Sequence, residues 1–207
     1  MTKEQIQKSV ELVLAEHPNR LRHIYGVRDT AIILGKKYNL DLEILEITAL
    51  LHDITKYYSK EENMEIINNY FPETDFIYKE YNDEILHSFS AYVIAKRKYK
   101  ITNDEILNSI LNHTVGRPNM SIYEKIIFVS DYIEPSRTYD SCVNVRKIVE
   151  ESLDKAVFTI INNSINFYEK ENSKIPSIAY KARQYYKSML EDKDDQNWND
   201  CKCIKRY

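Results

Sequence analysis

The sequence predicts a single all-α domain, and three observations carry this prediction. The chain of 207 residues contains only three glycines and five prolines, so residues that interrupt helices are rare. Apolar residues recur at helical spacing through most of the chain. Segments that cap helices lie between these apolar stretches. A chain of this length builds one hydrophobic core and is short for two domains.

Four helices are expected in the N-terminal third of the chain. They cover residues 3–16, 18–38, 41–51 and 60–69. His17-Pro18-Asn19 interrupts the apolar pattern between the first two helices. Asp41 is placed to cap the third helix with its side chain. Ser59 and Glu62 form a capping box at the start of the fourth, so that each side chain can bind the backbone amide of the other residue.

The remainder of the chain predicts one loop and several more helices. Residues 72–86 are aromatic and acidic, and we expect a loop there with one short helical piece. Helices are expected over residues 87–99, 103–112, 121–133, 141–170 with a break near 151, and 177–191. Two further capping boxes, Thr102 to Glu105 and Ser121 to Glu124, support this division. The total is about eight to ten helices.

One domain is expected to cover residues 1–191, with its core in 17–185. The tail, residues 192–207, is charged and is expected to be flexible. Aromatic and apolar residues in 72–100 can pack internally or form the interface of a homodimer, and the sequence leaves both options open.

Composition and charge exclude several classes of protein. The net charge of −3 argues against a nucleic-acid partner. The first residues form no apolar signal-peptide core, and no apolar run is long enough to span a membrane. Cys142, Cys201 and Cys203 are odd in number and lack the spacing of a disulfide framework, which favours the cytoplasm. Cys201 and Cys203 are spaced for a metal, but a charged tail argues against that role.

An adjacent His-Asp pair is the strongest chemical signal in the sequence. His52 and Asp53 end an apolar stretch that begins at Ile44, and Lys56 follows one helical turn later. An imidazole and a carboxylate are good ligands for a divalent metal. Neighbouring residues on a helix point about 100° apart. The pair therefore suits a metal only near a helix end, with further ligands arriving from other segments.

The chain contains enough other histidines and acids to complete such a site. Three more histidines lie near expected helix ends or loops, and Asp131 is an acid on an otherwise apolar helix. The candidate ligands are His23, His52, Asp53, His87, His113 and Asp131. Taken singly, each histidine can be a satisfied polar residue, and Asp131 can be the partner of a buried Lys or Arg. One metal needs about four protein ligands and two metals need about six. His17, the fifth histidine, lies in an exposed-looking turn.

The order of these residues resembles the HD superfamily of metal-dependent phosphohydrolases, and within it the YqeK-like family. The resemblance covers residues 17–185. It rests on Arg20–Val27, Ala49–Lys56, Leu86–Ser88, His113–Ser121, Asp131–Arg137, Val145–Lys147 and Leu153–Val157, which follow in the order of that family. Ile24 and Val115 depart from the pattern, since small polar residues often stand at these places.

The resemblance implies an activity and a cofactor. The activity is symmetrical hydrolysis of diadenosine tetraphosphate to two ADP, with a metal-bound water or hydroxide as the nucleophile. The cofactor is a pair of divalent metal ions, iron in this family, with manganese as an alternative. In this interpretation His23, His52, Asp53 and Asp131 bind the first metal. His87 and His113 bind the second, and Asp53 bridges the two.

A tetraphosphate substrate also requires positive charge beside the metals. Asp53, Lys56 and Arg137 are the candidate catalytic residues, since the two cations can contact phosphoryl oxygens. The candidate substrate-binding residues are Arg20, Lys56, Thr114, Gly116, Arg117 and Arg137. For each cation the alternative is a solvated surface residue. No residue is marked as a general acid, and ADP is a good enough leaving group for metal and cationic stabilisation to suffice.

Two other functions compete with this one. The first keeps the metals and changes the substrate to a cyclic nucleotide, a deoxynucleotide or another phosphate ester. The double-His and Gly-Tyr-Pro signatures of HD proteins that cleave cyclic dinucleotides do not occur here. The second is a non-catalytic, nucleotide-sensing HD domain, which is expected to have lost ligands, whereas this chain retains all six.

Overall fold

The computed structural model describes the backbone of residues 1–203 and the side chains of residues 1–192. Within this part the chain is all-α, as the sequence predicts, and contains no strand. The elements are α1 (Lys3–Val13), α2 (Pro18–Lys37), α3 (Leu42–Leu51), α4 (Lys60–Asn68), α5 (Asp75–Glu80), the 3-10 helix η1 (Asp83–Ile85), α6 (Leu86–Arg97), α7 (Asp104–Asn112), α8 (Ile122–Ile133), α9 (Asp140–Glu151), α10 (Leu153–Lys170) and α11 (Ser177–Cys203).

The helix starts follow the capping signals of the sequence with one exception. Ser59 and Ser121 form the expected capping boxes, and the Asp41 side chain accepts a hydrogen bond from the backbone amide of Glu43. At α7 the expectation is wrong by one residue, because Asn103 is the cap and its side chain accepts from the Glu105 amide. An asparagine oxygen is as good a cap as a threonine hydroxyl.

The number of helices and the end of the last one also differ from expectation. Eleven α-helices occur in the described residues, because α5 forms within 72–86 and Ser152 starts α10 as a new helix. Helix α11 continues to Cys203 instead of ending near residue 191. No Gly or Pro interrupts residues 192–203, so nothing in the sequence stops the helix. The flexibility of the tail stays a prediction, and residues 204–207 and the side chains of Cys201 and Cys203 lie outside the described part.

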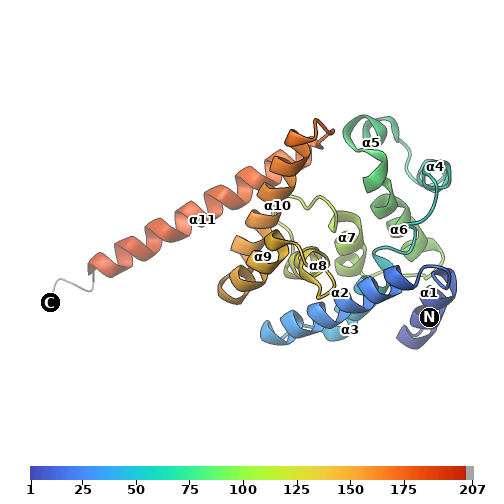
Figure 1. Ribbon diagram of the computed structural model, residues 1–207, viewed down its shortest axis with the longest axis horizontal. Coiled ribbons are helices and arrows are strands. Elements are labelled where there is room, and N and C mark those ends of the chain that lie inside the picture. Colours follow the sequence, from blue (N-terminus) through green and yellow to red (C-terminus); the bar gives the residue numbers. More distant parts are fainter. Residues whose placement is uncertain (204–207) are drawn as a thin grey trace.

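Two hydrophobic clusters form the body of the molecule. The first, here the C-terminal core, joins α2 and α3 to α8, α9, α10 and the start of α11. The second, here the N-terminal core, joins α1, α6 and α7 to the same two helices. A smaller cluster holds α4 and α5 against α6. Helices α2 and α3 lie side by side, and α8 packs against α2, α7 and α10 (Figure 1). Helices α2 and α3 contribute to both cores, and both helices pack against α8 along the seam between the two cores.

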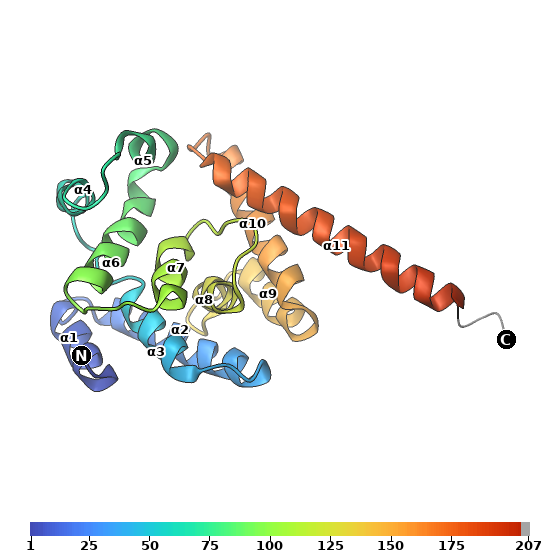
Figure 2. The same ribbon diagram turned by 180° about the vertical axis from the view of Figure 1, so that it is seen from behind.

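Helix α11 is the most extended element. It packs along α10 and then runs away from the body, so that the described C-terminal end lies far from the N-terminus (Figures 1 and 2). None of the helices in the described residues is long and apolar enough to cross a membrane.

Candidate metal centre

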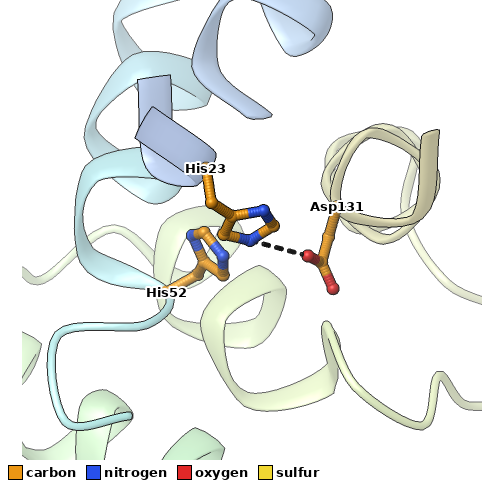
Figure 3. A group of neighbouring side chains, drawn as sticks. All are labelled: His23, His52 and Asp131. Carbon is orange, nitrogen blue, oxygen red and sulfur yellow. Dashed lines mark ion pairs between the residues drawn. The ribbon is translucent and has the colours of Figure 1, made fainter. Parts of the chain in front are cut away.

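The six candidate ligands converge at the seam between the two cores. His23 lies on α2, His52 and Asp53 follow α3, and His87 lies on α6. His113 follows α7, and Asp131 lies on α8. The four histidines and Asp53 are each at most 6% exposed, and the Asp131 side chain is 19% exposed. Figure 3 shows His23, His52 and Asp131 approaching one another from three different elements. Segments far apart in sequence thus form one polar cluster inside an otherwise apolar interior.

Asp53 lies at the middle of this cluster, and its two carboxylate oxygens face different histidines. Oδ1 lies 3.1 Å from His87 Nε2 and 3.6 Å from His113 Nε2. Oδ2 lies 3.3 Å from His52 Nε2 and 3.6 Å from His23 Nε2. His23 Nε2 also lies 3.0 Å from Asp131 Oδ1. One carboxylate between two pairs of imidazoles has the geometry of a ligand shared by two adjacent metal positions.

The remaining nitrogen of each histidine is held by a hydrogen bond that orients the ring. His52, His87 and His113 donate from Nδ1 to the carbonyl oxygens of Ala49, Glu84 and Ile110, each at 2.7 Å and each three residues earlier in the chain. This assignment of the tautomer follows from the hydrogen-bond network. It leaves the lone pair of Nε2 directed into the cluster, which is the arrangement of metal-binding histidines.

The cluster contains polar atoms that the protein itself does not satisfy. His52 Nε2 is buried without a hydrogen-bond partner, and an isolated buried polar atom of this kind is costly. Ligand atoms of His23, His52 and Asp131 lie within 4.8 Å of one another, and so do those of His52, Asp53 and His113. These nitrogen and oxygen donors fit a divalent metal.

Burial and neighbouring charges shift the pKa values of several residues in the cluster. Burial lowers the pKa of His87 to about 4, so this imidazole is neutral near pH 7. Burial alone raises the pKa of Asp53, but His52, His113 and His87 outweigh it and hold the pKa well below its usual value. The pKa of Asp131 is likewise depressed, because His23 and Arg137 outweigh its burial. A neutral imidazole and ionised carboxylates are the forms that bind metal, and His87, Asp53 and Asp131 are in these forms. The pKa of His23 is raised instead, because Asp131, Asp53 and Glu134 outweigh its burial.

Glu134 is a part of the site that sequence reasoning missed. This carboxylate is 1% exposed and accepts a hydrogen bond from His23 Nδ1 at 3.1 Å. Ser136 fixes it from the other side, through its backbone amide at 2.7 Å and its hydroxyl at 2.5 Å. Gly26 provides the space, because a Cβ there lies only 2.6 Å from Glu134 Oε2. A glycine one turn after His23 was the signal that could have revealed a buried neighbour.

Comparison with known proteins identifies the family. The model of the HD domain matches residues 20–136, which include all six candidate ligands. The chain belongs to the HD domain family. The resemblance seen in the sequence is thereby confirmed.

Relatives of this HD domain protein match over nearly their whole length. The chain is 37% identical to the symmetrical bis(5'-nucleosyl)-tetraphosphatase of Halalkalibacterium halodurans, over 90% of this chain and 98% of that protein. It is 34% identical to the enzyme of the same name from Bacillus subtilis, over 84% and 92%. The crystal structure of a predicted HD superfamily hydrolase involved in NAD metabolism from Clostridium acetobutylicum superposes with a TM-score of 0.84, at 34% identity over 91% and 98% of the two chains.

Three cations of the HD domain lie next to the ligand cluster. Arg20 contacts Asp53 Oδ2 at 2.6 Å, and Arg137 contacts Asp131 Oδ1 at 2.9 Å. Lys56 Nζ lies 3.4 Å from His87 Nδ1. The three therefore surround the metal centre from different sides, as a site for an anionic substrate requires.

Two cavities open beside the cluster, and Arg137 and Tyr139 line both of them. The larger has a volume of about 810 Å³ and is lined by His87, Asp131 and Lys56. The smaller has a volume of about 350 Å³ and is lined by His23 and Arg20. Both volumes lie in the range of ligand pockets. Each cavity thus has its own metal-ligand candidate and its own cation, and both share Arg137.

The other sequence candidates have different places. Thr114 lines the larger cavity, and its hydroxyl is buried without a hydrogen-bond partner. Gly116 adopts φ +71° in the turn after α7, which only glycine adopts without strain, but it lines neither cavity. Arg117 also lines neither, because its guanidinium binds Glu124 at 2.8 Å and 2.6 Å. Gly116 and Arg117 thus lie in the turn after α7, and a phosphate contact by either residue stays a prediction.

Proposed function

We propose that this chain is a metal-dependent hydrolase that cleaves diadenosine tetraphosphate symmetrically to two ADP. The observation that carries the proposal is the division of Asp53 between two pairs of histidines, in a chain that matches named symmetrical tetraphosphatases over almost their whole length. A centre shared between two metals is suited to displacement at a phosphoryl group.

The proposed ligands divide into two sets. His23, His52, Asp53 and Asp131 hold one metal, while His87 and His113 hold the other and share Asp53. A bound divalent metal supplies an activated water and withdraws charge from the phosphoryl oxygens. The ligand set contains nitrogen and oxygen donors and no thiolate, which favours iron or manganese over structural zinc. We propose iron as the native metal, with manganese as the alternative.

The protein's own cations neutralise the phosphate chain. Arg20 and Arg137 pair with Asp53 and Asp131, the two carboxylates that a metal engages. Once these carboxylates share their charge with the metal, both guanidinium groups are available for phosphoryl oxygens. Arg137 lines both cavities and can make a bidentate contact with a phosphoryl group, and Lys56 adds a third charge. The unpartnered Thr114 hydroxyl can donate to another phosphate oxygen.

Product analysis tests the reaction. The protein is purified without chelators under low oxygen, supplied with iron or manganese, and mixed with diadenosine tetraphosphate. We expect ADP as the sole product. ATP plus AMP shows attack at a terminal phosphate and contradicts symmetrical cleavage. No cleavage by a metal-loaded sample favours another phosphate substrate, such as a cyclic nucleotide or a deoxynucleotide, and after that the nucleotide-sensing alternative.

A variant tests the metal assignment. We expect Asp53→Ala to lower turnover by more than about a hundredfold, since losing even an outer partner of a metal ligand costs up to about that much. Metal content should fall while circular dichroism shows the helices retained. Asp29→Ala is the matched control, because Asp29 is exposed and its ion-pair partner is the neighbouring Arg28. Full activity of Asp53→Ala with unchanged metal content contradicts the assignment.

Location and assembly are further proposals. We propose a cytoplasmic protein, because Cys142 is a free, buried thiol, which suits a reducing compartment. A homodimer through residues 72–100 is the second proposal, supported by the exposed ring of Phe76. Light scattering tests it, and a monomer at all concentrations contradicts it.

A further inference from the structure

The space around Arg137 is divided into two cavities, and a metal centre alone does not require both of them. Arg137 and Tyr139 line both cavities, so the two cavities share part of their walls. The larger contains Lys56 and the smaller contains Arg20. Each cavity therefore has a cation of its own besides the Arg137 guanidinium that lines both. A substrate that lies only in the larger cavity does not use the Arg20 side.

The smaller cavity has an aromatic wall of its own. Tyr57 lines it and is 50% exposed. The Tyr57 ring is stacked on His17, with centroids 3.7 Å apart and an angle of 8° between the planes. This contact fixes the orientation of a ring that otherwise turns freely, and it gives a role to the one histidine that lies outside the metal cluster. The Arg20 guanidinium lies over the same ring, 5.8 Å from its centroid, so a base that stacks on Tyr57 requires Arg20 to turn from the ring toward the phosphates.

These features match the shape of a symmetrical dinucleotide. Such a molecule has a nucleoside at each end and a chain of phosphates between them. When the bond at its midpoint lies at the metals, the two halves must leave that point in different directions. An aromatic ring beside a cation suits a half that ends in a purine base, since bases stack on aromatic side chains. The exposed Asn19 side chain in the same cavity can hydrogen-bond a base edge.

We propose that the smaller cavity binds the second nucleoside of the substrate against Tyr57, while the first nucleoside lies in the larger cavity. This inference rests on the proposed function, because it assumes a substrate with two nucleosides. It assigns Arg20 to the phosphates of the second half, Lys56 to those of the first half, and Arg137 to the midpoint. Tyr57 then selects dinucleotides over mononucleotides.

Binding measurements test the subsite without relying on turnover. The ligands are ADP and a methylene-bridged analogue of diadenosine tetraphosphate, titrated calorimetrically into the metal-loaded protein. In the Tyr57→Ala variant we expect the Kd of the analogue to rise roughly tenfold, which corresponds to about 1.4 kcal/mol. The Kd of ADP should change less than about twofold, because a single nucleotide takes the larger cavity.

Two further variants separate stacking from a general effect of removing a tyrosine. Tyr57→Phe retains the ring and should bind both ligands as the wild type does. Tyr180→Ala removes a tyrosine that is 38% exposed and lines neither cavity, and it should leave both affinities unchanged. Equal weakening of ADP and the analogue in Tyr57→Ala, or no weakening of either, overturns the proposal.

The wild-type protein distinguishes failure of this inference from failure of the proposed function. If it binds the analogue no more tightly than ADP, the second nucleoside gains nothing and the subsite is wrong, whatever the products of the reaction. If it binds the analogue more tightly and Tyr57→Ala removes the difference, the subsite stands even where diadenosine tetraphosphate is not cleaved. In that case the proposed reaction alone fails.

Discussion

Two loops of this protein look alike in sequence and do different things in the structure. The loop after α7 begins at His113 and carries Arg117, and the loop after α8 follows Asp131 by one helical turn and carries Arg137. Arg117 turns away from the metal centre to a buried glutamate. Arg137 turns toward a candidate ligand and lines both cavities. A basic residue after a ligand helix is therefore not sufficient to identify a substrate contact.

The difference lies in what satisfies each loop's own polar groups. In the α7 loop the Arg117 side chain binds groups close to it in the chain. Besides Glu124, it donates hydrogen bonds to the carbonyl oxygens of Pro118 and Asn119. In the α8 loop the backbone carbonyl groups are bound instead by a residue from another helix. Arg146 on α9 binds the carbonyl oxygens of Ile133, Glu134 and Arg137 at 2.8, 2.8 and 2.6 Å. Because Arg146 holds the backbone, the Arg137 side chain is left for the site.

The largest effect is expected at the loop that contacts the site. Arg137→Ala should lower kcat/KM by about a hundredfold or more, the usual loss when a preorganised charge-stabilising group is removed. Steady-state kinetics with diadenosine tetraphosphate measures this loss, and metal content should stay near that of the wild type. Arg137→Lys retains the charge but not the bidentate geometry, so it should recover only part of the activity. An Arg137→Ala enzyme within about threefold of the wild type places the guanidinium outside the reaction.

An intermediate effect is expected at Glu134, which lies in the same loop and contacts His23 Nδ1 at 3.1 Å and Arg137 Nε at 4.0 Å. Glu134→Gln should weaken metal binding by about ten- to hundredfold, as the loss of a carboxylate partner of a ligating histidine typically does. Competition with a chelator measures the affinity directly. Glu171→Gln, an exposed acid after α10, is the control. Unchanged metal affinity in Glu134→Gln means that the rest of the structure holds His23 in place without this carboxylate.

The smallest effect on activity is expected in the α7 loop. Arg117→Ala should leave kcat/KM within about twofold, but it removes the cation that pairs with Glu124. This carboxylate is 1% exposed and retains the neutral donors Asn112 and the Ser121 amide. The free energy of unfolding should therefore fall by about 1–3 kcal/mol, less than for a fully buried pair because the Arg117 side chain is 35% exposed. Urea denaturation gives this value, and the exposed Arg22→Ala is the comparison. A large loss of activity with no loss of stability reverses the roles assigned to the two loops.

The six residues that converge could be predicted from the sequence, because their types and their order along the chain resemble the ligand pattern of the HD superfamily. His52 and Asp53 could be recognised from their place at the end of an apolar helix. The sequence did not predict Glu134, because an acid before a proline reads as an ordinary helix end. Its burial depends on Gly26, which lies on a helix far away in the chain. Such a contact follows from packing and not from local pattern.

The same limit explains why the pairing of Arg117 and some helix boundaries were not predicted. In the structure Arg117 pairs with Glu124. In the sequence the capping box with Ser121 already accounts for this glutamate, so nothing indicates a second partner. In fact Glu124 serves both, since it also accepts from the Ser121 amide. At α7 the sequence offered Thr102 and Asn103 as neighbouring caps, and local preference does not separate them by more than a few tenths of a kcal/mol. The all-α class was predictable because composition and apolar period agree along the whole chain.

The three histidines that donate to a carbonyl three residues earlier have a consequence for metal exchange. Each ring is oriented by its own turn of backbone, so folding has already removed much of the rotational entropy that a metal otherwise has to remove. A metal-free form of the centre should then be preorganised, so that ions can leave or enter without the helices unfolding. Unlike a zinc finger, whose fold requires the ion, this protein should remain helical when a chelator strips it, and activity should return on adding metal without a refolding step.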